Sequence, residues 1–180
     1  MFVQTQNTPN PNSLKFLPGK KVCSIEPFEI TDKNISDNEL VRNILSINGV
    51  KGIFLSEDFL SVNKSENTKW EEIKHIIISL INEYYLSGKE IVIDSNKKSN
   101  KEKELLDVEK KIINLLETKI RPAVARDGGD IKFENYKDGI VEVKLEGSCS
   151  GCPSSKMTLK QGVQNLLCHY IPEIKEVVAN

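Results

Sequence analysis

Two cysteines separated by two residues, Cys149 and Cys152, lie between a strand-like run and a helix-like run. Pro153 follows directly, and proline is favoured at the first position of a helix. The pair therefore lies at a predicted helix N-terminus, where the helix dipole favours thiolate over thiol. Such a pair is suited to bind a metal or to perform redox chemistry.

Three kinds of site fit the pair equally well at this point: a zinc ion, an iron–sulfur cluster and a catalytic dithiol. Structural zinc and [4Fe–4S] clusters usually have about four protein ligands, and the sequence has no second Cys-x2-Cys motif. Cys168 and His169 lie about 24 Å further along the predicted helix, too far to complete the same site. A symmetric dimer would supply two thiolates from each copy. A cluster held between chains by four exposed sulfurs would be assembled and released easily, as a carrier requires.

The composition limits the partners that we expect. The 180 residues contain 25 Lys and Arg against 26 Asp and Glu, a net charge of −1, which gives no reason to expect nucleic acid or an anionic membrane as a partner. No apolar run approaches the ~20 residues of a membrane span. Residues 1–5 begin neither a signal peptide nor an Arg-rich presequence. We therefore expect a cytoplasmic protein, with a mature mitochondrial protein as the less favoured alternative.

A polar stretch divides the chain. Residues 89–103 carry no apolar side chain after Ile93 and are typical of a solvated linker. The linker separates a first predicted domain, residues 1–88, from a second, residues 104–180. Both domains mix strands and helices, so the predicted fold class is α+β with two small domains.

The first domain has clear local signals. A turn-rich run, Asn7–Asn12, contains two prolines and is predicted either to be an irregular turn or to form a rigid recognition surface. Ser36 or Asp37 is predicted to cap the first helix and Gly49 to end it. The predicted elements are strands at 2–6 and 13–17, a helix at 37–47, a hairpin of 50–55 with 59–63, and a helix at 70–86.

The second domain is predicted to run helix, strand, strand, helix, strand. Pro122 lies inside the first helical pattern, so we expect a kink or an early stop near Ile120. The elements are a helix at 103–125, a hairpin of 131–136 with 140–145, a helix at 153–170 and a strand at 175–179.

Other residues that could bind a metal have simpler explanations. Asp127 and Asp130 are predicted to serve turn and capping roles, while one of the two glycines between them ends the helix in a left-handed conformation. Cys168 and His169 are neighbours on a helix and do not share a face. Cys23 is predicted to be a small buried hydrophobe.

The motif around the cysteine pair resembles the C-terminal domain of the NifU and Nfu proteins. The resemblance rests on the run Gly147–Ser155, with Thr158-Leu159-Lys160 after it and Ile120-Arg121-Pro122 and Asp127–Asp130 before it. The first half resembles the companion Nfu N-terminal domain, through the run Gln4–Phe16, Gly49-Val50 and Asp58-Phe59. The resemblance covers nearly the whole chain except the linker.

The resemblance implies a homodimer in which Cys149 and Cys152 of two protomers bind a bridging [4Fe–4S] cluster, with [2Fe–2S] as an alternative occupant. It also implies that the cluster comes from an upstream scaffold and goes to apo iron–sulfur client proteins. We expect no covalent substrate chemistry, and hence not an enzyme. The shorter Nfu type, in its cytosolic bacterial form, fits best. Two other interpretations stay open: a dithiol–disulfide oxidoreductase and a zinc-dimerised interaction module.

Overall fold

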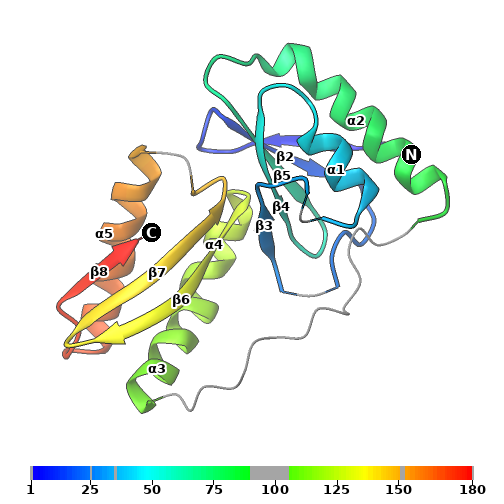
Figure 1. Cartoon of the computed structure of the whole chain (residues 1–180). Coiled ribbons are helices and arrows are strands. Elements are labelled where there is room, and N and C mark those ends of the chain that lie inside the picture. Colours follow the sequence, from blue (N-terminus) through cyan, green and yellow to red (C-terminus); the bar gives the residue numbers. More distant parts are fainter. Residues whose placement is uncertain (1, 25, 35, 90–105, 151–152, 180) are drawn as a thin grey trace.

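The computed structural model describes residues 2–24, 26–34, 36–89, 106–150 and 153–179, and for 153–156 the backbone only. It has two sheets, each with its own helices, and these form two packed units (Figure 1). The predicted α+β class with two small domains is confirmed. The predicted linker lies outside the described residues, apart from Lys89. No helix in the described ranges is long and apolar enough to cross a membrane.

The first unit is a five-stranded antiparallel sheet in the order β1-β2-β5-β4-β3. Its elements are β1 (Gln4–Asn7), β2 (Ser13–Leu17), β3 (Phe28–Ile30), α1 (Glu39–Leu45), β4 (Val50–Leu55), β5 (Leu60–Lys64) and α2 (Trp70–Leu86). The side chains of Ile73, Ile77 and Ile81 recur at helical spacing on α2 and are buried in the core of this unit.

The local predictions for this unit hold with three exceptions. The helix α1 ends at Leu45, with Ser46 as its C-cap, and not at Gly49 as predicted. The helix at 70–86 and the hairpin of β4 and β5 are confirmed. The cap of α1 is Asn38, whose side chain accepts a hydrogen bond from the Val41 N–H, and not Ser36 or Asp37 as predicted. The strand β3 was not predicted, because three half-buried residues are too short for an alternating pattern to be visible.

The second unit is a three-stranded sheet in the order β6-β7-β8, with β6 antiparallel and β8 parallel to β7. Its elements are α3 (Asp107–Leu115), the π-helical segment η1 (Leu116–Ile120), α4 (Arg121–Arg126), β6 (Gly129–Lys137), β7 (Ile140–Gly147), α5 (Pro153–Tyr170) and β8 (Glu176–Ala179). The predicted hairpin is confirmed. Asp138 and Gly139 both have positive φ, 53° and 88°, as a tight turn between two strands favours.

A π-helical segment lets the chain continue as a helix across Pro122. Proline donates no N–H and its ring clashes with the carbonyl of the preceding turn, so it disturbs a regular α-helix. Here η1 widens the turn just before the proline, and Pro122 then occupies the first turn of α4. The predicted disturbance near Ile120 is therefore a local widening that lets the helical path continue to Arg126.

The start of α4 is tied to the sheet by an ion pair between Arg121 and Asp130. Arg121 donates two hydrogen bonds to Asp130, from Nε to Oδ1 at 2.8 Å and from Nη2 to Oδ2 at 2.7 Å. Asp130 is 3% exposed at the start of β6. It therefore anchors α4 to β6, which is a different role from the turn or cap that the sequence suggested.

We predict that Asp130→Asn lowers the free energy of unfolding by about 1.5–3 kcal/mol, because it removes a charge-assisted, bidentate pair from a mostly buried position. Denaturant unfolding would measure the change. The matched control is Glu117→Gln, which removes the second, half-exposed acidic neighbour of Arg121 at 3.8 Å. That variant should lose at most about 0.5 kcal/mol. Equal losses in the two variants would contradict the anchoring role of Asp130.

Candidate functional site

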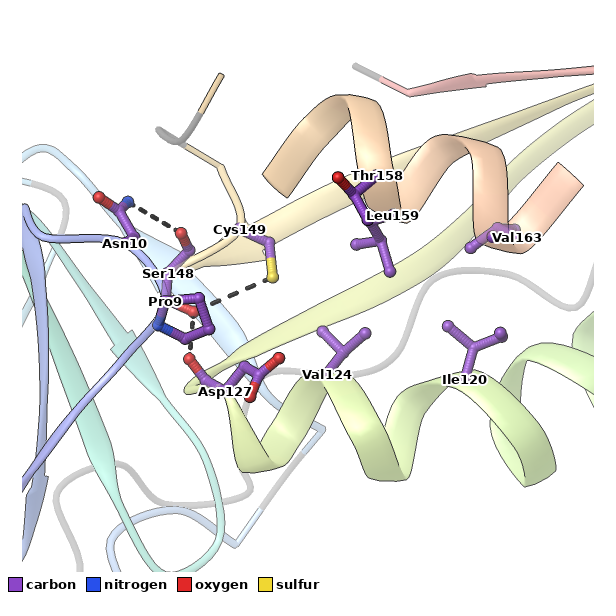
Figure 2. A pocket seen from close by; sticks show the side chains of 11 residues that line it. Pro9, Asn10, Ile120, Val124, Asp127, Ser148, Cys149, Thr158, Leu159 and Val163 are labelled. Carbon is purple, nitrogen blue, oxygen red and sulfur yellow. Dashed lines mark hydrogen bonds between the residues drawn. The ribbon is translucent and has the colours of Figure 1, made fainter. Parts of the chain in front are cut away.

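Cys149 lies at the junction between β7 and α5 and is 6% exposed. Its sulfur points into a cavity of about 490 Å³ between the helical path of η1 and α4 on one side and α5 on the other (Figure 2). The walls come from both units of the chain: Pro9, Asn10, Ile120, Val124, Asp127, Ser148, Cys149, Thr158, Leu159, Gly162 and Val163. The cavity is therefore mostly apolar, with a thiol in its wall.

Backbone hydrogen bonds fix the loop that carries Cys149. Gly147 has φ +68°, and its carbonyl accepts the Ser150 N–H at 3.2 Å. The Ser148 N–H donates to the Gly128 carbonyl at 3.2 Å, and its hydroxyl donates to the Asp127 carbonyl. The cysteine loop is therefore bonded directly to the end of α4, and Cys149 is held on both sides.

The two glycines of the Asp-Gly-Gly-Asp motif make room for this loop. Gly128 has φ +83° and follows the end of α4, which confirms the predicted left-handed glycine. A Cβ on Gly129 would lie 2.9 Å from the sulfur of Cys149 and 2.6 Å from the Glu146 carbonyl oxygen. Glycine at this position therefore lets β6 pass directly beneath the cysteine side chain.

Three side chains of the first unit reach the cysteine loop. Asn10 donates from Nδ2 to the Ser148 carbonyl, and Asn63 donates from Nδ2 to the Gly147 carbonyl, each at 2.9 Å. The Ser150 hydroxyl donates to Glu29 at 3.3 Å. The sequence did not identify these contacts. The one signal was the proline-flanked run that contains Asn10, which was left open as a turn or a recognition surface.

Burial changes the ionisation of the polar groups at this contact. Burial raises the pKa of Glu29 above its ordinary value, and the neighbouring Glu146 carboxylate adds to the rise, while hydrogen bonds from Ser150 and Asn63 oppose it. Glu146 itself is held by Lys132 and Lys144, each at 2.9 Å. Burial is also the main reason that the pKa of Lys15 is lowered. Charge is thus costly on this surface.

Cys168 and Cys23 are not brought to Cys149. The Cys168 thiol donates to the Ile174 carbonyl at 3.2 Å, and Cys23 is buried in the core of the first unit, as predicted. No group of three or more His, Cys, Asp or Glu residues within the described ranges is arranged to hold a metal ion. The second predicted ligand, Cys152, lies outside the described residues.

The comparisons with known proteins agree with this architecture. The family model "NifU-like domain" matches residues 112–178, and the model "Scaffold protein Nfu/NifU N terminal" matches residues 3–88. The chain is 43% identical over 180 residues to the human "NFU1 iron-sulfur cluster scaffold homolog, mitochondrial", covering 98% of this chain and 71% of the relative. The chain therefore belongs to the Nfu/NifU scaffold protein family.

Two further matches are a plant relative and a solved structure. "NifU-like protein 4, mitochondrial" from Arabidopsis thaliana is 40% identical over 184 residues, covering 98% of this chain and 65% of the relative. A solved NifU-like protein from Saccharomyces cerevisiae aligns with 53% of this chain and 87% of its own, at 31% identity and a TM-score of 0.48. The chain spans about two thirds of the length of the Arabidopsis and Drosophila relatives it matches.

The prediction of a bacterial cytoplasmic protein is wrong. It rested on the lack of an apolar run long enough to span a membrane and on residues 1–5. The relatives from Arabidopsis, Drosophila and human that match 98% of this chain are all named mitochondrial proteins.

We predict that Gly129→Ala lowers the free energy of unfolding by about 1–3 kcal/mol, because its Cβ would overlap the Glu146 carbonyl and the Cys149 sulfur. The control is Gly162→Ala on α5, where an added Cβ meets nothing within 4 Å. That change should raise the free energy of unfolding by about 0.5–1 kcal/mol, since alanine favours helix. Denaturant unfolding of both variants checks the difference, and equal tolerance would contradict the tight crossing at Gly129.

A second prediction concerns Glu29. Because the pKa of Glu29 is raised in the folded protein, its charged form lowers the free energy of unfolding at neutral pH. This loss disappears as the pH falls through the raised pKa towards the unfolded value near 4.5. Glu29→Gln should therefore have the higher melting temperature at neutral pH, and the difference should vanish by about pH 4. Thermal unfolding of both proteins across this range measures it. Parallel pH profiles would contradict the prediction.

Proposed function

We propose that this chain is an iron–sulfur cluster scaffold and carrier. Two copies would bind one [4Fe–4S] cluster as cargo through Cys149 and Cys152 of each, with [2Fe–2S] as an alternative cargo. The cluster would be received from an upstream scaffold and passed to apo iron–sulfur client proteins. The human relative named an iron–sulfur cluster scaffold supports the class of cargo, and the names of the relatives support a mitochondrial location.

The observation that carries the proposal is the fixed position of the Cys149 thiol, in the wall of a cavity between α4 and α5. Its loop is fixed by hydrogen bonds at Gly147 and Ser148, yet the described residues supply no set of three ligands to a metal. A [4Fe–4S] cluster usually needs four thiolates. One chain with one Cys-x2-Cys motif supplies two, so a second copy related by a two-fold axis completes the number.

The release step follows from the same ligand count. A client thiolate replaces a scaffold thiolate at one iron, so one iron–sulfur bond forms as another breaks. The leaving Cys thiolate then takes up a proton from water, and the oxidation state of the cluster does not change. The walls beside Cys149 are largely apolar, which limits the access of water to the sulfur until the site opens.

We predict that anaerobically reconstituted protein contains about four irons and four sulfides per dimer. Cys149→Ala and Cys152→Ala should each abolish cluster retention, since each removes two of four thiolates from the dimer. Cys168→Ala is the matched control and should keep the cluster, because Cys168 bonds the Ile174 carbonyl near the other end of α5. Iron and sulfide analysis, Mössbauer spectroscopy and size measurement provide the readouts.

Three outcomes would overturn the proposal. A loaded monomer would exclude the shared cluster. Zinc without iron after expression in iron-replete cells would favour a zinc-dimerised module. Efficient disulfide turnover by the metal-free protein, with no iron uptake, would favour a dithiol oxidoreductase.

A further inference from the structure

One face of the five-stranded sheet is polar and yet buried. Strand register places alternate residues on opposite faces. The face towards α1 and α2 carries apolar side chains such as Phe16, Ile53 and Val62. The opposite face, here called the docking face, carries Ser13, Lys15, Glu29, Phe54, Ser61 and Asn63, which the register of β2, β3, β4 and β5 places together.

The second unit of the chain covers the docking face. Ser61 is 0%, Phe54 1% and Lys15 8% exposed, although none of them belongs to the core under α1 and α2. Lys15 donates from Nζ to the Ala125 carbonyl at 3.2 Å, across to the end of α4. Polar side chains on one face of a sheet are usually exposed to solvent, so their burial here marks a specific contact.

The contact is directed at the backbone of the cysteine loop. Asn63, on the docking face, and Asn10, in the neighbouring loop, donate to the carbonyls of Gly147 and Ser148, the two residues immediately before Cys149. The bond from Asn10 is buried and joins residues 138 positions apart in the sequence. Side-chain amides that pair with loop carbonyls in this way recognise a particular loop conformation.

Two glycines of the second unit, Gly128 and Gly147, lie so close to the docking face that a side chain would not fit. A Cβ on Gly128 would lie 2.8 Å from the Ser61 hydroxyl, and a Cβ on Gly147 would lie 2.9 Å from Cγ of Phe54. Both glycines also have positive φ. The cysteine loop and the end of α4 can therefore approach the sheet only because these two positions lack side chains.

The contact between the docking face and the second unit contains buried polar groups that weaken it. The hydroxyls of Ser13 and Ser61 are buried without a hydrogen-bond partner among the described residues. Lys15 is largely removed from water without an ion pair at hydrogen-bond distance among the described residues. Buried polar groups that are imperfectly paired oppose association, and polar interfaces between domains commonly open. Docking is therefore specific in geometry but modest in free energy.

We propose that the docking face, together with Asn10, is a binding site for the cysteine loop of the second unit, residues 147–150. It fixes the loop that carries Cys149, whose side chain packs in the core of the second unit with its sulfur in the cavity that Pro9 and Asn10 help to wall (Figure 2). Undocking exposes the loop. The further consequence, that undocking must precede sharing of a cluster between two copies, rests on the proposed function.

The test uses variants that remove the amide donors with little change of shape. Asn10→Asp keeps the oxygen that accepts the Asn12 N–H at 2.9 Å, but it replaces the donor to Ser148 with a repelling carboxylate. Asn63→Asp does the same at Gly147. In the metal-free, reduced 180-residue chain, we expect iodoacetamide to alkylate Cys149 roughly 2- to 10-fold faster in each variant, and faster again in the double variant. Tandem mass spectrometry resolves Cys149 from Cys152.

Two controls separate undocking from unfolding. Asn43→Asp makes the same charge change at an exposed position on α1 and should leave the Cys149 rate unchanged. Cys23 is 1% exposed in the core of the first unit and should stay slow in every variant. An unchanged Cys149 rate in the double variant would overturn the proposal. So would a parallel rise at Cys23, because Cys149 would then be protected only by the general stability of the fold.

The outcome does not depend on cluster binding, because the metal-free protein is measured. If alkylation accelerates as expected but the protein never binds iron, the docking site stands and the proposed function fails. If the protein binds the cluster but the variants do not change the alkylation rate, the docking site fails alone. A faster rate of cluster loading in the double variant would link the two.

Discussion

The structure around Cys149 depends on three points of close backbone approach. Gly128, Gly129 and Gly147 lie where the end of α4, the start of β6 and the cysteine loop cross, and a Cβ at any of them would fall within 3 Å of a neighbour. Glycine alone meets both the space and the positive φ at Gly128 and Gly147. The hydrogen bonds from Ser148 to the end of α4 form because the backbones approach so closely here.

Several of these features could be predicted from the sequence, because each depends on residues that are close together in the chain. The periodicity of α2, the turn at Asp138-Gly139 and the proline after Cys152 each depend on residues a few positions apart. The left-handed glycine after α4 was predicted for the same reason. The separation of Cys168 from Cys149 could also be predicted, since it needed only the length of a helix.

What could not be predicted depends on partners distant in the sequence. Asp130 resembled a turn residue, and only the fold shows that Arg121 holds it. The widening at η1 needed knowledge of how Pro122 packs. Ser61 and Asn63 lie on the face that alternation assigns to solvent, and nothing in β5 itself indicates that a second unit covers that face. Asn10 donates a hydrogen bond to Ser148, 138 positions away. The prolines beside Asn10 indicated a rigid loop, but they did not indicate which residue the loop contacts.

In the proposed function, the polarity of the docking face lowers the free energy needed to release the cargo. A ligand shifts an equilibrium between two states only by the difference in its affinity for them. If the loop were buried under apolar surface, a large part of the binding free energy of the cluster would be needed to open it. Hydrogen bonds to loop carbonyls contribute little net free energy, because water can replace them. In the proposed function, a polar contact therefore holds the empty loop in one conformation and still lets a shared cluster, or an incoming thiolate, shift the protein to the open state.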